Sequence, residues 1–253
     1  MEPKIFLYHY TSQKGLLGIL KNGKLRMTNI LYLNDSSEYS HCFDLFLKDL
    51  NLDCDLESFL QRSTTDPDYF IFSLSENGDD LNQWRGYCPP TGGYCIEFDP
   101  KKLSSIVKRE GYKLEKILYN KDEKEKKIRS ISHGLSVSPN SKSIEKEKLL
   151  IRMLPVAPYL KDDAFEKEQE WRIICDTFDV ACDICHKEGK SMIIPYVERL
   201  FIDENQLLPL SKIFIGPTPH QELSKKSVES LIKSSRYANH IEVECSSIPY
   251  RSW

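Results

Sequence analysis

The sequence predicts an α+β fold within a single domain that spans residues 1–253. Strand-like segments with a two-residue alternation are dispersed among segments with helical apolar spacing, and the two kinds do not follow a regular β-α-β order. The composition, with 40% hydrophobic and 29% charged residues, is typical of a globular protein. A chain of this length can bury one core, with or without an insertion.

The first elements follow directly from the residue pattern. Residues 4–10 predict a strand in which His9 lies on the apolar face. An N-cap at Thr11 or Ser12 and a stop at Gly23 bound the helix that follows. The apolar stripe of this helix is formed by Leu16, Leu17, Ile19 and Leu20.

The remaining elements are expected where the same periodicities recur. Strands are expected at residues 25–28, 69–75, 92–98, 112–119, 170–175, 191–197, 212–216 and 240–245. Helices are expected at residues 36–50, 79–87 and 144–154. Asp35 and Glu38 form a capping-box-like start for the first of these. A last helix begins at Pro219, and its core-facing residues are Leu223, Val228, Leu231 and Ile232.

Residues 120–160 change in character and predict a charged helical insertion. Their first thirty residues are rich in Lys, Glu and Ser and contain few large apolar side chains. This composition is typical of a solvated helix followed by a loop.

Charge and composition exclude several classes of protein. The chain has 35 basic and 38 acidic residues, so no global basic field indicates a nucleic-acid-binding protein. No run of 18 apolar residues occurs, and no membrane span is expected. The first ten residues do not resemble a signal peptide, and the eight cysteines are scattered without a disulfide framework. We therefore expect a cytoplasmic protein with reduced thiols.

Two patterns in the N-terminal third could carry chemistry. His9 is either a core histidine with one hydrogen bond or a neutral imidazole that orients a ligand hydroxyl. Ser73 and Ser75 lie on the less apolar face of their strand, where serine is a poor filler. They are either two small residues that are tolerated beside a bulge, or they allow another backbone segment or a ligand to approach closely.

A third pattern is the pair Glu168 and Glu170. On an extended chain both side chains point the same way, together with Arg172. The pair is either a surface feature neutralised by Arg172 or a lysine, or a functional pair. In the second case one carboxylate accepts hydrogen bonds from a ligand while the other positions a nucleophile.

A fourth pattern concerns metal binding. Cys182, Cys185 and His186 match the haem-attachment string C-x-x-C-H, but no export signal accompanies it, and we interpret the match as chance. Cys175 could complete a four-ligand zinc site, although it is expected inside a strand. The zinc alternative stays open, and no metal is expected in the main site.

Several linked segments resemble one known family. "LYHYTSQKGLLGILKNGKLRMTNILYLNDSSE", "FSLSENGDDLNQWRGY", "GGYCIEFD", "EKEQEWRII" and "IFIGPTP" are similar, in this order, to the bacterial family catalogued as domain-of-unknown-function family 2971. The resemblance extends from residue 7 to about residue 251. The layout of that family resembles the ADP-ribosyltransferase fold, which implies a split, mixed and mostly antiparallel sheet flanked by helices.

The same resemblance implies roles for the residues of the three patterns. NAD is the implied substrate, with Glu170 as the catalytic carboxylate and Glu168 orienting the nucleophile. His9, with Tyr10 and Thr11 beside it, holds a ribose hydroxyl, and Ser73 and Ser75 support the nicotinamide. Trp84 and Tyr87 are the candidates for stacking on nicotinamide, and Arg172 steadies a phosphate. The residues of the implied site are His9, Tyr10, Thr11, Ser73, Ser75, Trp84, Tyr87, Glu168, Glu170 and Arg172.

The implied function is that of an NAD-dependent ADP-ribosyltransferase that modifies a macromolecular acceptor, either protein or nucleic acid. Such enzymes often act as bacterial toxins or phage-defence effectors, with an antitoxin or defence protein as partner. Two alternatives stay open: a catalytically inactive nucleotide- or partner-binding module of the same fold, and a metal-dependent nuclease. The nuclease would use Glu168, Glu170, Asp79 and Asp80 around a divalent metal.

Overall fold

The structure is a computed structural model. It describes residues 5–33, 44–45, 47–48, 69–132, 154–176, 184–189, 191–238 and 241–250. The capping pair Asp35 and Glu38, most of the expected helix 36–50 and nearly all of the expected helix 144–154 lie outside these residues.

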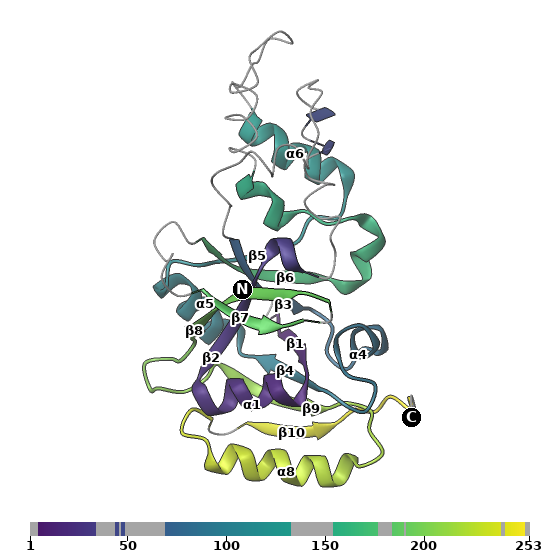
Figure 1. The fold of residues 1–253 in the computed structure, drawn as a ribbon, viewed down its shortest axis with the longest axis vertical. Helices are drawn as coiled ribbons and strands as arrows, with labels where there is room; N and C mark the ends of the chain where they lie inside the picture. The colour runs from purple at the N-terminus through teal and green to yellow at the C-terminus, as the bar shows by residue number, and fades with distance from the viewer. Residues whose placement is uncertain are drawn as a thin grey trace.

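One large sheet dominates the structure (Figure 1). Its ten strands among the described residues are β1 (Leu7–Thr11), β2 (Lys24–Asn29), β3 (Tyr69–Ser75), β4 (Tyr94–Phe98), β5 (Lys113–Lys116), β6 (Glu170–Asp176), β7 (Cys185–Glu188), β8 (Ile193–Leu200), β9 (Leu210–Ile215) and β10 (Glu242–Cys245). The strand order is β10-β9-β4-β1-β3-β2-β8-β7, and β6 pairs with both β3 and β5. The pair β9–β10 is parallel, and the other strand pairs are antiparallel. The predicted α+β class with a mixed, mostly antiparallel sheet is confirmed.

Helices flank this sheet on several sides. The α-helices bounded within the described residues are α1 (Gln13–Asn22), α4 (Leu81–Tyr87), α5 (Pro100–Arg109), α6 (Lys121–Ser132) and α8 (Gln221–Ser234). The short 3-10 helices are η1 (Ile30–Tyr32), η2 (Leu154–Tyr159) and η3 (Asp163–Glu168). Figure 1 shows α8 beneath β10 and α6 at the opposite end of the long axis.

The first helix forms as its end signals predict. The Ser12 hydroxyl accepts a hydrogen bond from the Gly15 N–H, which is the N-cap arrangement. Gly23 ends the helix in the left-handed region at φ 66°, where glycine has no Cβ to clash, and its N–H donates to the Ile19 carbonyl.

Two predictions about helix faces are wrong. Leu17 of α1 is 40% exposed, and Leu223 of α8 is 67% exposed. Each lies at the margin of a narrow apolar stripe, where the helix turns its side chain away from the sheet. The buried residues of these two helices are Leu16, Ile19, Leu20, Val228 and Ile232.

The sequence interpretation missed helix α5. Asp99 is its N-cap and accepts hydrogen bonds from two backbone N–H groups, and Pro100 occupies the first turn. An Asp-Pro pair before an apolar stripe is a start signal for a helix, so the sequence did carry the information. The buried stripe consists of Leu103, Ile106 and Val107.

The predicted insertion has two different ends. Helix α6 forms its start, as expected from the charged composition. The far end, residues 154–160, is instead packed into the body of the protein, as the burial of its apolar side chains shows. The buried side chains of this end are Val156, Ala157, Tyr159 and Leu160.

The sheet forks along one edge of β3. Strand β6 pairs with β3 over its whole length, so it fills one edge. On the other edge β2 pairs at Phe70 and Ile71, whereas β1 pairs at Ser75. Strands β1 and β2 therefore diverge across Phe72–Leu74, and the sheet splits there into two parts.

The predicted faces of β3 are confirmed. Phe70, Phe72 and Leu74 belong to the main hydrophobic core, together with Ile173 and Cys175 of the neighbouring strand β6. The opposite face of the fork carries Ser73, whose side chain borders the cavities described below.

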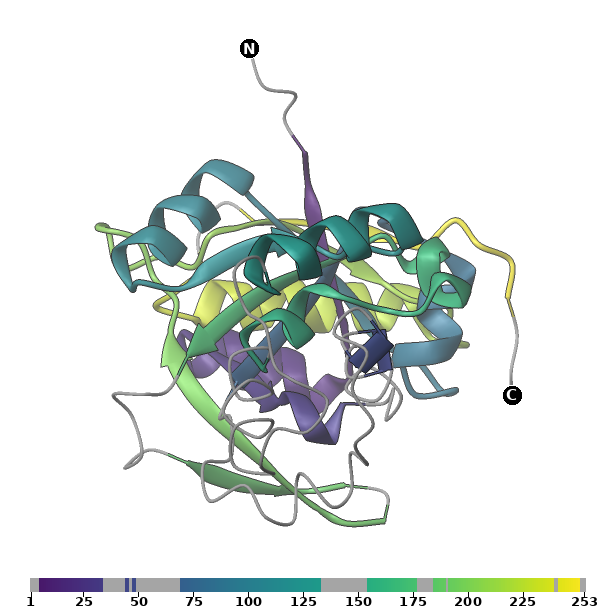
Figure 2. The ribbon, with the colours of Figure 1, turned by 90° about the horizontal axis from the view of Figure 1, so that it is seen from above.

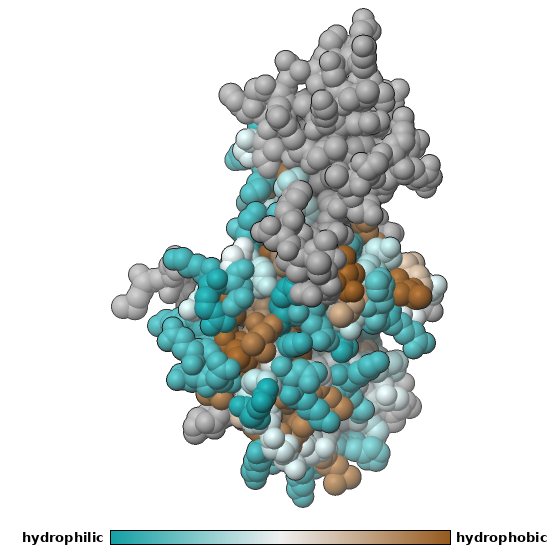
Figure 3. Space-filling model, turned by 60° about the vertical axis from the view of Figure 1, so that its left-hand side comes forward, coloured by the Kyte–Doolittle hydropathy of each residue, from teal (hydrophilic) through white to brown (hydrophobic). Residues whose placement is uncertain are grey.

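The visible surface is mixed in polarity. On the face that Figure 3 shows, hydrophilic residues surround separate hydrophobic patches. Exposed large apolar side chains include Met192 at 58% and Ile193 at 68%, at the turn between β7 and β8. Within the described ranges, the helices are too short or too polar to cross a bilayer.

Candidate functional site

Two neighbouring cavities lie at the fork of the sheet. The large cavity has a volume of about 450 Å³ and is lined by residues of β1, α1, β2, β3, β7 and β8. The small cavity has a volume of about 60 Å³ and reaches the start of β6. Four residues line both cavities, which places the two side by side: His9, Tyr10, Ser73 and Tyr87.

The small cavity gathers most of the predicted site. The predicted residues that line it are His9, Tyr10, Ser73, Ser75, Tyr87, Glu168 and Glu170. They come from five separate elements, β1, β3, α4, η3 and β6. Thr11 lines the large cavity, whereas Trp84 and Arg172 line neither. The fork thus assembles residues that lie far apart in the sequence.

His9 bridges the fork and faces both cavities. Its Nδ1 lies 2.9 Å from the Ser73 carbonyl oxygen, and its ring stacks on Phe72 with 4.2 Å between the centroids. Because a carbonyl only accepts, Nδ1 carries the proton, and in the neutral ring Nε2 is an acceptor. The hydrogen bond expected of a structural histidine is confirmed. The role of His9 toward a ligand hydroxyl, through Nε2, stays a prediction.

The pKa of His9 predicts a stability change at acid pH. Burial lowers the pKa of His9 to about 4, and the charge of Lys187 acts in the same direction. Between pH 6.5 and 4 the unfolded chain binds a proton that the folded chain does not, so stability falls as the pH is lowered through this window. We expect the loss from His9 to reach about 1–2 kcal/mol at pH 5.

Chemical denaturation at pH 7 and pH 5 checks this expectation. His9→Asn is the matched variant, because its amide can still donate to Ser73 but does not titrate. The variant should lose less stability than the wild type between the two pH values. An equal loss in both proteins would show that His9 does not titrate in this window.

The Glu168–Glu170 pair is not on an extended chain as predicted. Gln169 lies between them in the left-handed region at φ 43°, where η3 ends and β6 begins. The two carboxylates still converge, because the Lys161 ammonium lies 2.7 Å from Glu168 Oε2 and 3.0 Å from Glu170 Oε2. The two carboxylates are therefore close because of the turn at Gln169 and the shared contact with Lys161, and not because alternate residues of a strand share a face.

Glu170 is a buried anion with compensated charge. Arg172 donates from Nε to Oε1 at 2.8 Å and from Nη2 to Oε2 at 3.0 Å, and Lys161 adds a third contact. Burial alone would raise the pKa of the Glu170 carboxyl, but the charges of Arg172 and Lys161 outweigh it and hold this pKa below its ordinary value. Glu170 is therefore ionised at neutral pH.

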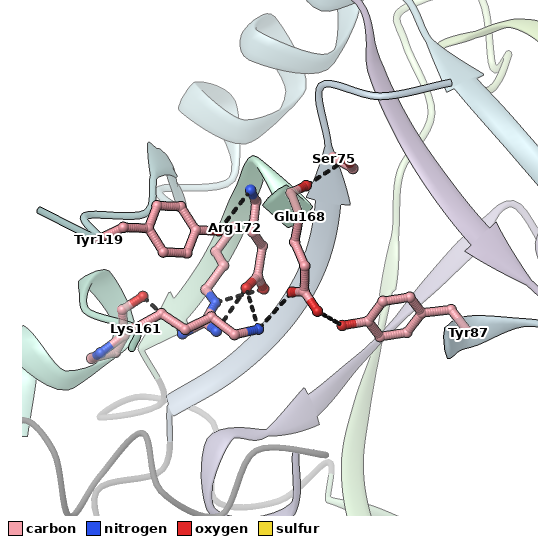
Figure 4. A network of polar contacts seen from close by, with 8 residues as sticks. Ser75, Tyr87, Tyr119, Lys161, Glu168 and Arg172 are labelled. Atoms are coloured by element: carbon pink, nitrogen blue, oxygen red, sulfur yellow. Dashed lines mark hydrogen bonds and ion pairs between the residues drawn. The ribbon is translucent and has the colours of Figure 1, made fainter. Parts of the chain in front are cut away.

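Arg172 is not placed where it could contact the phosphate of a ligand, since it lines neither cavity. It is fully buried, its guanidinium forms a bidentate pair with Glu170, and its Nη1 donates to the Pro158 carbonyl. The prediction that Arg172 steadies a phosphate is wrong, because these contacts occupy its donors inside the protein. Figure 4 shows the side chain of Arg172 packed within this network of polar contacts.

Glu168 is the more accessible of the two carboxylates. Its side chain is 20% exposed, against 6% for Glu170. The Tyr87 hydroxyl donates to Oε1 at 2.7 Å from the side opposite to Lys161 (Figure 4). Ser75 fixes the backbone here, since its hydroxyl donates to the Glu168 carbonyl at 2.7 Å. Ser75 thus has a clear role: it pins the turn that presents Glu168.

Of the two aromatic residues proposed to stack on nicotinamide, only Tyr87 reaches the cavities. Trp84 is 4% exposed and packs in a second core cluster with Tyr10 and Cys95. Its indole N–H donates to Asp79 at 2.9 Å. The prediction for Trp84 is therefore wrong: it is a core residue of α4 whose ring packs edge-on against Tyr10, and it lines neither of the two cavities.

Sequence reasoning missed Lys161 and Tyr119. Lys161 follows the buried segment 154–160, and its backbone N–H donates to the Leu118 carbonyl. Tyr119 accepts the Glu170 N–H at 3.0 Å on its hydroxyl oxygen. No local pattern marks either residue, because both owe their role to contacts across the fold.

Among the described residues, those suggested for a metal site do not come together. Asp80 caps α4, and Asp79 binds Trp84 and the backbone and hydroxyl of Ser247, so neither lies beside Glu168. Cys185 and His186 are consecutive in β7 and point to opposite faces, while Cys182 lies outside the described residues. In the part of the chain that the structure describes, no group of three or more His, Cys, Asp and Glu side chains could hold a metal ion.

Part of the chain matches a known protein family. Residues 83–173 match a family whose description is "Protein of unknown function (DUF2971)", which confirms the resemblance over this segment. The matched segment contains Tyr87, Lys161, Glu168, Glu170 and Arg172, and it ends before the C-terminal strands. No match was found among curated proteins or among solved structures.

Proposed function

We propose that this protein is an NAD-dependent ADP-ribosyltransferase that modifies a macromolecular acceptor in the cytoplasm, as a toxin or phage-defence effector. One observation carries the proposal: His9, Ser73, Ser75, Glu168 and Glu170 border one small cavity at the fork of a split sheet. The adjoining large cavity offers room for the rest of a dinucleotide.

The geometry supports a distinct role for each carboxylate. Glu168 is the accessible anion, so we assign it the contact with the reacting ribose and the acceptor. Glu170 is buried and paired, and it holds the Lys161 ammonium in place. In this proposal Glu168 is the catalytic residue and Glu170 is a positioning residue. This assignment exchanges the roles that the family resemblance implied for the two carboxylates, because the Glu170 side chain is only 6% exposed and is already paired.

The chemistry then proceeds with balanced atoms and charge. The bond between C1′ of the ribose and the nicotinamide nitrogen breaks, and neutral nicotinamide leaves with the electron pair. The negative charge of Glu168 stabilises the oxocarbenium ion that develops at C1′. The nucleophile of the acceptor bonds to C1′ and gives its proton to Glu168. His9 Nε2 accepts a hydrogen bond from a ribose hydroxyl and thereby fixes the orientation of the sugar.

Incubation of the purified full chain with NAD labelled in the ADP-ribose part tests this proposal. We expect release of free nicotinamide and transfer of label to a component of a bacterial lysate. The heat-denatured protein gives the background for both readouts. A wild-type protein that binds NAD and yet releases no nicotinamide, with or without lysate, would rule out the transferase.

A second candidate function is a nucleotide-binding module without turnover. It is favoured by the charge balance, since the two cations Lys161 and Arg172 offset the two carboxylates. This module binds NAD without releasing nicotinamide, and Glu168→Gln leaves its biological effect intact. Measuring NAD binding and nicotinamide release on the same sample separates the two candidates.

A further inference from the structure

The large cavity contains a cation without a described counter-charge. Lys187 of β7 lines this cavity and is partly buried. Its ammonium donates to the Thr28 hydroxyl at 3.2 Å and lies 5.9 Å from the centre of the Tyr196 ring. Within the described ranges no carboxylate lies within ion-pair distance of Lys187.

The two basic residues of β2 that line this cavity differ from Lys187 of β7 because each has a carboxylate partner. Arg26 donates to Glu198 at 2.9 Å, and the Lys24 ammonium lies 3.8 Å from the same carboxylate. Lys14 of α1 lines the cavity from the other side. In total the lining has four basic side chains against two acidic ones, so the cavity favours an anion. The lining residues with formal charge are Lys14, Lys24, Arg26, Lys187, Glu188 and Glu198.

Partial burial destabilises the charged form of Lys187. Burial lowers the pKa of Lys187, and the nearby charge of Arg26 lowers it further. A partly buried ammonium without a carboxylate lacks the compensation that interior charges normally have. An anionic ligand would supply the missing partner. The hairpin β7–β8 that carries Lys187 projects from the rest of the sheet (Figure 2), and the cavity lies between it and α1.

We propose that Lys187 binds a phosphate or diphosphate group of a small nucleotide in the large cavity, with His9 at the adjoining sugar. The choice of a nucleotide rests on the function proposed above, whereas the anion subsite rests on the cavity itself. A small ligand is favoured over a nucleic-acid backbone because Lys187 is partly buried inside a cavity that spans several elements.

Titration with ADP, pyrophosphate and adenosine tests the subsite without any need for turnover. We expect the wild type to bind ADP, with pyrophosphate competing. Lys187→Met should weaken ADP binding about tenfold or more, because a charge-assisted hydrogen bond is lost, and should abolish competition by pyrophosphate. Adenosine binding should change by less than about twofold, since adenosine has no phosphate.

Two further variants serve as controls. Lys187→Arg keeps the charge and should retain most of the affinity. Lys212→Met removes another strand lysine, one that pairs with Glu244 and does not line this cavity, and should leave ADP binding unchanged. Without ligand, Lys187→Met should unfold at the same temperature as the wild type or higher, because an uncompensated charge is removed.

Four results would overturn the inference. They are an absence of ADP and pyrophosphate binding by the wild type, equal ADP affinity in Lys187→Met, a lower unfolding temperature of the free variant, and Lys187-dependent binding of single-stranded RNA that ADP does not displace. Binding of ADP through Lys187 without nicotinamide release would instead support the subsite while the transferase fails.

Discussion

Arg172→Met is expected to lower the free energy of unfolding by about 3–5 kcal/mol, because it leaves a buried carboxylate without its main cation. Arg172 is fully buried, and both of its contacts to Glu170 are lost in the variant. Glu170 then stays in the interior with Lys161 as its remaining cation, and Lys161 is shared with Glu168. Because native proteins are stable by only about 5–15 kcal/mol, this loss is a large part of the total.

Urea denaturation at pH 7 measures this effect. The pKa of Glu170 lies below its ordinary value in the folded protein, so the network contributes at neutral pH and its contribution is lost as the pH falls toward the folded pKa. The double variant Arg172→Met, Glu170→Leu is the control, and it should recover part of the loss because no buried anion is left unpaired. A loss below about 1 kcal/mol in the single variant would mean that the network is not rigidly buried.

On the proposed transferase function, Glu168→Gln is expected to reduce nicotinamide release and label transfer by about 10²–10⁴-fold. The glutamine side chain has the same shape and can still accept the Tyr87 hydrogen bond on its amide oxygen. It cannot take the proton of the acceptor or stabilise positive charge at C1′. The variant should fold, because Glu168 is partly exposed and Glu170 keeps both of its cations.

Glu166→Gln is the matched control for this variant. Glu166 lies in the same short helix η3 and is exposed, and it lines neither cavity. It should retain wild-type activity. If Glu168→Gln keeps full activity while a folded Glu170→Gln loses it, the assignment of roles between the two carboxylates is reversed.

Local signals were sufficient for much of the fold. The alternation in residues 69–75 predicts which side of β3 faces the core, because a strand period of two leaves little ambiguity when one face is fully apolar. The caps at Ser12 and Gly23 predict the bounds of α1. The start of α5 is also encoded locally, by Asp99 as its N-cap and Pro100 in its first turn.

The candidate site was predictable only in part. The positions of His9, Ser75 and Glu170 followed from motifs in a resembling family, and the structure brings these residues to one cavity. Their partners were not predictable, because Lys161 reaches the two carboxylates through a turn at Gln169 that no periodicity describes. A tryptophan such as Trp84 can pack in a core or stack on a ligand, and the sequence alone does not distinguish the two. The structure does, because Trp84 packs with Tyr10 and Cys95.

The pairing of β3 with β6 has a consequence for synthesis of the chain. Ser75 pairs with Glu170 and Tyr69 pairs with Asp176, so a strand made early acquires its full-length neighbour only after two thirds of the chain has left the ribosome. Contacts of such long sequence separation form slowly. Until then neither glutamate is beside His9. A nascent or truncated chain that ends before residue 170 therefore lacks the assembled site, so the site cannot form until at least two thirds of the chain has been made.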